Sequence, residues 1–305
     1  MLVLRKEPYN VGKSPSERTV EERLRFGVVP IDKPPGPTSH EVAAFVRRIL
    51  NVKKTGHTGT LDATVSGVLP VLLEESCKAS KVIMGGKKSY VCVARLAKER
   101  PAKEIREAFA HFKGKIWQKP PLASAVAKKL RVREVFSLNV TEIKGRLVLF
   151  DAETEAGTYI RNIVRDAGEV IGDGAEMAEL RRTSSGGFNE GQCVTLQELS
   201  DRHWLWKEKG QEGPLKECVH QIEDLIGLKK VVTSDDAIHS ITTGANLAIP
   251  GINELDETIT KGDRVGIYSG KGELLCIADA MLGADEIKSR EKGIAFDVAR
   301  VIHGY

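Results

Sequence analysis

Residues 56–73 read GHTGTLDATVSGVLPVLL and combine two kinds of local structure. Positions 56–67 are rich in Gly and Thr, which is typical of a loop. Positions 68–73 form an unbroken apolar run, which favours a buried strand. Because its glycines let the backbone take positive φ or approach a ligand closely, the loop is a candidate functional site.

Asp62 is the one acidic residue of this loop. An Asp in such a setting is more often a turn residue that bonds its own backbone. The glycines and His57, five residues upstream, favour a functional role instead. A single carboxylate fits nucleophilic or positioning work better than a two-carboxylate acid–base scheme. The residues alone therefore give a candidate without a reaction.

The flanking sequence predicts both helices and strands. A short apolar strand at 26–31 is broken by the turn-forming DKPPGP at 32–37, and Thr38 or Ser39 is suited to cap a following helix. Apolar residues then recur at helical spacing, which predicts one buried face. Further patterns predict strands at 90–96, a helix at 102–112, a hairpin through 135–155, a helix at 158–170 and a helical connection at 201–228.

The two ends of the chain differ from its middle. Residues 1–24 are polar and are predicted to lie as an extension over the main body. From residue 229 onward, short apolar strands are punctuated by Gly, which predicts a compact β-rich module. We therefore expect an α+β protein with an N-terminal extension (1–24), a catalytic domain (25–228) and a β-rich domain (229–305).

Composition limits the class of protein. The 305 residues are 41% hydrophobic and 29% charged, so a sizeable core can form without disulfides or metals. The five cysteines are scattered without a Cys-x-x-Cys pair, which supports neither a zinc site nor a redox motif. Charged residues interrupt positions 1–10, and no apolar run is long enough to span a bilayer. We expect a cytoplasmic protein without a membrane segment.

Positive charge is concentrated in one segment. The net charge is +4, but residues 113–133 contain seven Lys or Arg and no acidic residue. Such runs are usually solvated surface. Trp117, Pro120 and Pro121 are unusual in a simple charged helix and favour a contact with an RNA backbone, where the cations would neutralise phosphates.

Several collinear segments resemble one enzyme family, the RNA pseudouridine synthases of the tRNA-synthase-B and dyskerin group. The resemblance covers residues 20–303 and is closest to the archaeal and eukaryotic branch. Matches in this number are far more specific than any single motif. The matching segments are 27–42 (GVVPIDKPPGPTSHEV), 56–71, 88–91 (KSYV), 118–134, 156–163 (AGTYIRNI), 174–188, 194–199, and, similar to a PUA domain, 242–252 and 292–302.

The resemblance implies the reaction, the fold and the partners. The fold would be a mixed-sheet pseudouridine synthase domain followed by a small PUA domain. The enzyme would isomerise uridine in RNA without cofactor or metal, after taking the base out of its stack. Its partners would be box H/ACA guide RNA, rRNA targets and small H/ACA core proteins, with the tRNA T-loop uridine as a further target. The alternatives are a stand-alone tRNA pseudouridine synthase and a non-catalytic RNA-binding scaffold.

The resemblance also assigns roles to five residues. Asp62 would be the catalytic carboxylate, acting on the ribose, on the base, or as a base toward a ribose proton. Arg161 would pair with Asp62, and Tyr90 would stack on the uracil. Ile163, where the group usually has Leu, would pack under the base, and His57 would contact the flipped nucleotide.

Two positions depart from the family pattern. Ala63 replaces the Pro expected after the catalytic Asp, which predicts a looser turn. Ser185 replaces an Arg or another residue in the R-R-T-x-S-G stretch, which predicts the loss of one RNA contact.

Overall fold

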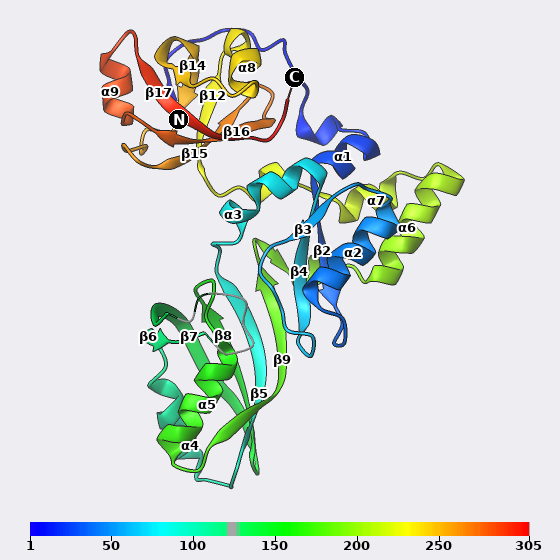
Figure 1. The fold of residues 1–305 in the computed structure, drawn as a ribbon, viewed down its shortest axis with the longest axis vertical. Coiled ribbons are helices and arrows are strands. Elements are labelled where there is room, and N and C mark those ends of the chain that lie inside the picture. Colours follow the sequence, from blue (N-terminus) through cyan, green and yellow to red (C-terminus); the bar gives the residue numbers. More distant parts are fainter. Residues whose placement is uncertain (121–126, 128, 305) are drawn as a thin grey trace.

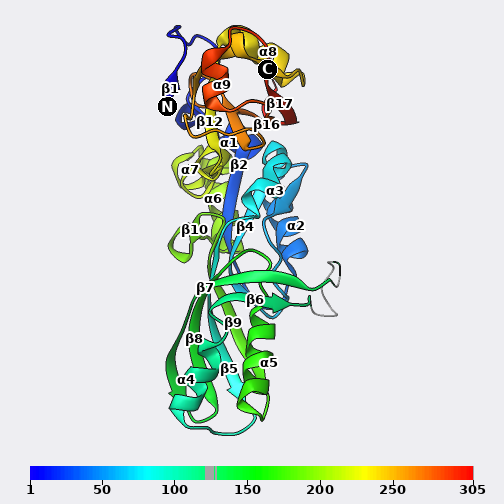
Figure 2. The ribbon, with the colours of Figure 1, turned by 90° about the vertical axis from the view of Figure 1, so that its left-hand side faces the viewer.

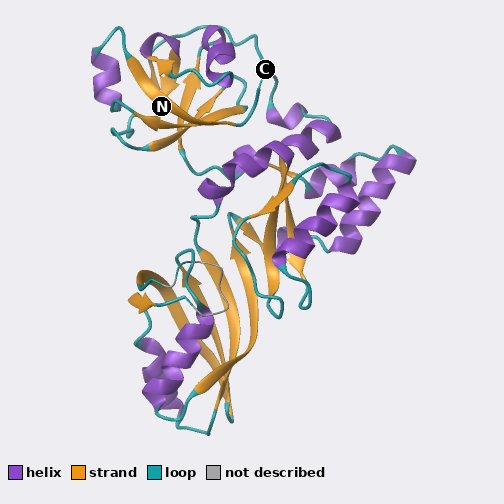
Figure 3. Cartoon of the chain, in the orientation of Figure 1, coloured by secondary structure: helices purple, strands orange, loops and turns teal. Residues whose placement is uncertain are grey.

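The computed structural model describes residues 1–120, 127 and 129–304, and its strands form two sheets (Figures 1 and 3). Among the described residues, a ten-stranded sheet has the order β11-β2-β4-β9-β5-β8-β7-β6, with β3 on β4 and β10 on β9. A seven-stranded sheet has the order β1-β14-β12-β15-β16-β17-β13. The predicted α+β class is confirmed.

The elements of the larger sheet occupy most of the chain. Its strands are β2 (Gly27–Lys33), β3 (Thr55–His57), β4 (Ser66–Leu73), β5 (Lys88–Leu96), β6 (Gly114–Gln118), β7 (Arg131–Lys144), β8 (Leu147–Thr154), β9 (Ala175–Ser185), β10 (Phe188–Asn189) and β11 (His220–Gln221). Its main helices are α1 (Val20–Phe26), α2 (Ser39–Leu50), α3 (Ser80–Ile83), α4 (Ala102–Ala110), α5 (Ile160–Ile171), α6 (Leu196–Lys209) and α7 (Gly213–Cys218).

The part of the sheet around β2 and β4 is covered on both faces. Val29 and Ile31 pack with α2 and α6, whereas Val28 packs with α3 and with residues of the C-terminal module. Because successive side chains of a strand point to opposite faces, burial of both faces requires an unbroken apolar sequence. This explains the apolar runs at 27–31 and 68–73.

The part of the sheet around β5 is covered by helices on one face. Every second residue of β5, from Tyr90 to Leu96, is buried against α4 and α5, while the residues between them are partly or fully exposed. Figure 3 shows both helices on the same side of these strands. The loop before β4, which carries Asp62, therefore lies where the part of the sheet with both faces covered meets the part with one face covered.

The seven-stranded sheet forms the C-terminal module, at the top of Figure 1. Its strands are β12 (Lys229–Thr233), β13 (Leu247–Ala248), β14 (Ile252–Leu255), β15 (Arg264–Tyr268), β16 (Leu274–Ala280) and β17 (Ile294–Val301), with helices α8 (Asp235–Thr242) and α9 (Ala284–Ser289). A separate cluster of buried apolar residues fills it.

The N-terminal extension lies over this C-terminal module. Its first strand, β1 (Leu2–Val3), pairs with β14, and the Tyr9 hydroxyl donates to Glu254 Oε1 at 3.2 Å. Further along, Arg18 makes two hydrogen bonds, of 2.8 and 2.7 Å, to the carboxylate of Glu223 in a buried position. No helix among the described residues is both long and apolar enough to cross a membrane.

The close approach of α5 to β9 generates a prediction at Gly168. A Cβ at this position would lie 2.1 Å from the backbone nitrogen of Ala175. Replacing a helical glycine with alanine normally stabilises a protein by about 1 kcal/mol. We expect Gly168→Ala to destabilise this protein by about 2 kcal/mol, because backbone must move to admit the methyl group.

Urea unfolding of Gly168→Ala and of the control Gly213→Ala measures this difference. A Cβ at Gly213, in α7, has no atom within 4 Å, so the control should unfold within about 1 kcal/mol of the unmodified protein. Unfolding of Gly168→Ala at higher urea than the unmodified protein would contradict the packing of α5 on β9.

Candidate active site

Asp62 lies on the loop between β3 and β4, and Ser39 anchors the residue before it. The Ser39 hydroxyl accepts the backbone N–H of Leu61 at 2.8 Å and donates to the carbonyl of Leu61 at 3.0 Å. Ser39 is the first residue of α2, whose start is fixed by a capping box between Thr38 and Glu41. The loop is thus tied to a helix end that is itself well fixed.

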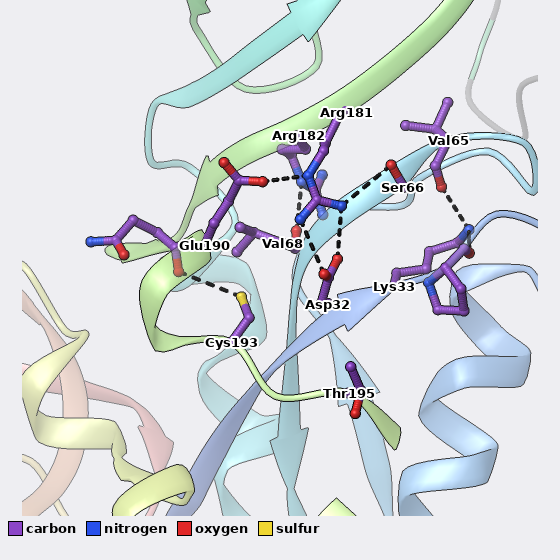
Figure 4. A network of polar contacts seen from close by, with 12 residues as sticks. Asp32, Lys33, Val65, Ser66, Val68, Arg181, Arg182, Glu190, Cys193 and Thr195 are labelled. Atoms are coloured by element: carbon purple, nitrogen blue, oxygen red, sulfur yellow. Dashed lines mark hydrogen bonds and ion pairs between the residues drawn. The ribbon is translucent and has the colours of Figure 1, made fainter. Parts of the chain in front are cut away.

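Lys33 supports the other side of the same loop. Its ammonium is fully buried and donates to the carbonyls of Ala63, Val65 and Pro34 at 3.1, 2.7 and 2.9 Å. Figure 4 shows the bond to Val65. The N–H of Gly36 also donates to the Ala63 carbonyl, at 2.8 Å. Burial, followed by the charge of Arg182, lowers the pKa of Lys33. These bonds hold the turn in which Ala63 stands in place of the expected Pro.

Arg182, on β9, supports the loop from within the sheet. Its side chain is 1% exposed, and it donates to the carbonyls of Val68 and Gly59 at 2.8 and 3.1 Å. Strand β4 approaches β9 very closely at Gly67, where a Cβ would lie 2.2 Å from the Arg182 carbonyl. Gly67 also has a φ of +105°, so this crossing requires glycine on two grounds.

The neighbouring Arg181 points to the other face of β9 and joins it to β2. Its guanidinium makes two 3.0 Å hydrogen bonds to the carboxylate of Asp32, and it also pairs with Glu190 (Figure 4). Planar bidentate pairing of this kind is geometrically specific. Consecutive arginines therefore fix β9 to β2 on one face and to the site loop on the other.

Asp62 itself forms an ion pair with Arg161, which lies in the first turn of α5. The two side chains are 46% and 33% exposed, so solvent or a ligand can reach the pair. The predicted contact is therefore present in the structure. It joins a loop supported from the β2–β4 part of the sheet to a helix packed on the β5–β8 part.

Two of the other predicted residues, Tyr90 and Ile163, are buried. Tyr90 is buried opposite Arg182 in the register of β5 and β9, and Ile163 is fully buried in the same cluster of apolar side chains. Burial raises the pKa of the Tyr90 hydroxyl, and the charge and hydrogen bond of Arg182 oppose this. Their roles toward a substrate stay predictions.

His57, at the end of β3, is half-buried with its ring edge-on to His40 at a centroid distance of 4.7 Å. Burial, and then the nearby His40 and Arg182, lower the pKa of His57. Its imidazole is therefore expected to be uncharged near neutral pH. Ser185 is 1% exposed, so this serine is not placed to contact RNA.

The residues that support the loop were not predicted as functional residues. Lys33, Ser39 and Arg182 lie within the family motifs, but the burial of the two cations was not expected, because lysine and arginine are rarely buried. One sequence signal was available for Lys33, which ends a buried strand and precedes two prolines and a glycine. Burial at that position leaves only the loop carbonyls as partners for its ammonium.

Lys88, the first residue of β5, is a further buried cation beneath the loop. Its ammonium donates to the carbonyls of Met84 and Gly86 at 3.0 and 2.9 Å, and its Cε lies 3.2 Å from where a Cβ on Gly59 would be. Burial, and then the charge of Arg182, lower the pKa of Lys88 to about 8.

The lowered pKa of Lys88 predicts how stability depends on pH. Between about pH 8 and 10.5 the unfolded chain keeps a proton on Lys88 that the folded chain has released, so stability rises with pH across this window. We expect the stability of the unmodified protein relative to Lys88→Met to rise by on the order of 2 kcal/mol from pH 7.5 to pH 10.

Urea unfolding at several pH values measures this change. Lys87→Met, at the exposed neighbouring lysine, controls for the loss of one surface cation. The lowered pKa of Lys88 would be contradicted if the difference in stability between the unmodified protein and Lys88→Met stayed constant from pH 7.5 to pH 10.

Four family models match consecutive parts of the chain. The model of the TruB family pseudouridylate synthase N-terminal domain matches residues 47–160, and that of the tRNA pseudouridylate synthase B C-terminal domain matches residues 161–226. A PUA domain matches residues 229–302, and a DKCLD (NUC011) domain matches residues 2–43.

Known relatives and solved structures agree with these matches. A protein of Archaeoglobus fulgidus named "Probable tRNA pseudouridine synthase B" is 46% identical over 292 residues, covering 95% of this chain and 90% of the relative. One of the same name from Pyrococcus furiosus is 44% identical, covering 95% of this chain and 86% of the relative.

Among solved structures, a chain of a Cbf5–Nop10–Gar1 complex matches with a TM-score of 0.90 and 42% identity, over 99% of this chain and 92% of that one. A chain of an H/ACA ribonucleoprotein bound to a substrate RNA containing 2′-deoxyuridine matches with a TM-score of 0.89 and 40% identity, over the same shares. The chain therefore belongs to the TruB family of pseudouridylate synthases and carries a PUA domain toward its C-terminal end.

Proposed function

We propose that this enzyme converts uridine to pseudouridine in RNA with Asp62 as its catalytic carboxylate. The observation that carries this assignment is the accessible ion pair of Asp62 with Arg161 on a rigidly supported loop. The carboxylate is available to a ligand, while the bonds from Lys33 and Ser39 limit movement of the backbone on either side of it. A scaffold that only bound RNA would not need this arrangement.

The reaction is an isomerisation and balances without a co-reactant. The bond between ribose C1′ and uracil N1 breaks, the uracil turns, a bond from C1′ to C5 forms, and the C5 hydrogen leaves as a proton while N1 gains one. Asp62 would act as a nucleophile toward the ribose or the base, or as a base toward a ribose proton. In each case the carboxylate takes part in the chemistry, and Arg161 orients it.

We propose that Tyr90 and Ile163 form the floor of the uracil site and that His57 lies at its edge. The uridine must leave its stack to reach Asp62, at a cost of a few kcal/mol. An aromatic ring above a packed apolar cluster offers a surface on which a base can stack. The uncharged His57 would contact the nucleotide through hydrogen bonding or stacking and not through charge.

The C-terminal module, which we assign to residues 229–305, would anchor RNA away from the reacting base. A cavity of about 480 Å³ on it is lined by Arg5 of the N-terminal extension and by Lys288, Arg290 and Lys292, with Glu291 as the single acidic residue. Four cations around one cavity suit a phosphate backbone. We assign the extension to residues 1–24 and the catalytic domain to residues 25–228.

We further propose that the enzyme works in the cytoplasm as the catalytic subunit of an H/ACA particle. The support is the likeness, over almost the whole chain, to solved chains from a Cbf5–Nop10–Gar1 complex and from an H/ACA ribonucleoprotein with a substrate RNA. Guide RNA would select uridines in rRNA, and small core proteins would complete the particle. The relatives are named as tRNA pseudouridine synthases, which favours tRNA as a second substrate. The enzyme would modify it without guide RNA.

Asp62→Asn tests the catalytic assignment. We expect at least a thousandfold loss of single-turnover rate with RNA affinity changed less than about threefold, because the carboxylate acts in the chemistry and not in docking. Pseudouridine is quantified by mass spectrometry of digested RNA, and affinity by filter binding. Asp201→Asn, at an exposed carboxylate on α6 that accepts a hydrogen bond from Gln197, is the control. More than about a tenth of the unmodified rate in Asp62→Asn would refute the assignment.

The same assay separates the two RNA substrates. The enzyme is given a T-loop transcript alone, and an rRNA fragment with and without an H/ACA guide RNA and core proteins. Guide-dependent modification of the rRNA fragment supports the particle. If the T-loop transcript is modified and the rRNA fragment is not, with or without guide RNA and core proteins, the protein is a stand-alone tRNA enzyme and the particle proposal is wrong.

A further inference from the structure

The end of β6 is bonded to the start of α5 through the side chain of Gln118. The Gln118 amide donates to the carbonyl of Tyr159 at 3.1 Å and accepts the N–H of Tyr159 at 2.9 Å. Gln118 is only 4% exposed, so both bonds lie away from water. The Gln118 side chain thus holds both the backbone N–H and the backbone carbonyl of Tyr159, the residue just before α5.

A third bond joins the same two segments. The side chain of Asn162, 3% exposed, donates to the carbonyl of Lys119 at 2.9 Å. Residues 118 and 119, at the end of β6 and directly after it, are therefore bonded to residues 159 and 162, and Arg161 lies between these two in the sequence. We call the three hydrogen bonds made by Gln118 and Asn162 the amide clamp.

The first turn of α5 starts differently from that of two other helices. Helices α2 and α6 begin with capping boxes, made by Thr38 with Glu41 and by Thr195 with Glu198. At the start of α5, the Tyr159 side chain makes no capping bond. The amide clamp bonds the backbone of Tyr159 and the side chain of Asn162 to the end of β6, on either side of Arg161 in the sequence.

Strand β6 belongs to the basic run, residues 113–133. Exposed lysines lie just before β6, along it, just after it and ahead of β7, at positions 113, 115, 119 and 129. Figure 2 shows β6 and the adjoining part of β7 projecting from the body of the molecule on the side of α5. Part of the basic run, residues 121–126 and 128, lies outside the described residues. Cations at 115 and 119 flank the clamp directly.

We propose that Gln118 and Asn162 are positioning residues, which set the position of Arg161 and, through it, the orientation of the Asp62 carboxylate. They also tie this position to β6, whose exposed lysines we expect to contact RNA. This inference rests on the proposed function and deepens it. One rigid unit then contains both Lys115 and Lys119, which would hold the RNA backbone, and Arg161, which orients the catalytic carboxylate. A small displacement of Arg161 misorients the reacting carboxylate while the RNA stays bound.

The test uses Gln118→Ala and Asn162→Ala with Asn139→Ala as the matched control. Asn139 donates an amide hydrogen bond between strands of the same sheet, at 2.9 Å to Asp151, away from α5. We expect the single-turnover rate at saturating RNA to fall by about 10- to 100-fold in both clamp variants and less than twofold in the control. RNA affinity should stay within about threefold in all three.

A double variant separates positioning from general loss of structure. If Gln118 acts through Arg161, adding Gln118→Ala to Arg161→Lys should lower the rate no further than Arg161→Lys alone. A purely structural role would make the two losses multiply. Gln118→Glu adds a pH signature, because a protonated Glu can both donate to and accept from Tyr159, as Gln does. Its rate relative to the unmodified enzyme should rise as the pH falls from 8 to 6.

The outcomes distinguish the inference from the function on which it rests. If the unmodified enzyme forms pseudouridine and the clamp variants match Asn139→Ala in rate, the clamp inference is wrong and the function stands. Multiplying losses in the double variant also overturn it. If the unmodified enzyme forms no pseudouridine in any RNA, the proposed function fails first. Circular dichroism of each variant confirms that the rates compare folded proteins.

Discussion

The ion pair between Asp62 and Arg161 is the contact on which the site depends, because it joins two parts of the molecule that are held in place separately. The Asp62 loop rests on Lys33, Ser39 and Arg182, whose bonds reach loop carbonyls and one N–H. Burying the cations Lys33 and Arg182 costs free energy that their hydrogen bonds offset, and removing one of these partners would leave a buried cation incompletely bonded. That cost is consistent with a site in which backbone precision matters more than stability.

The sequence predicted most of the fold where local patterns are strong. The helix after Thr38, the strands at 68–73 and 90–96 and the hairpin through 135–155 all form, because their periodicity or apolar runs match the surfaces they bury. It missed β9, whose LRRTSS end looks polar although Arg182 is buried there. The parallel pairing of β4 with β9 across more than 100 residues has no local signal.

The site was predicted only with the help of the family resemblance. From the residues alone, Asp62 was a candidate, and nothing linked it to Arg161, 99 positions later. The structure brings them into contact because α5 packs on the sheet beside the loop. Apart from the position of Lys33 at the end of a buried strand, the sequence held no signal for the supporting residues, because Ser39, Arg182 and Gln118 acquire their roles only when the fold buries them beside backbone groups that need partners.

The central claim is that catalysis requires a guanidinium that orients the Asp62 carboxylate. The single-turnover rate of Arg161→Lys at saturating RNA, with RNA affinity measured in parallel, tests it most directly. Lysine keeps the positive charge but cannot supply the planar fork of arginine. The account predicts a rate at least about tenfold lower with RNA affinity unchanged within about threefold. An Arg161→Lys enzyme that forms pseudouridine at the unmodified rate would contradict it.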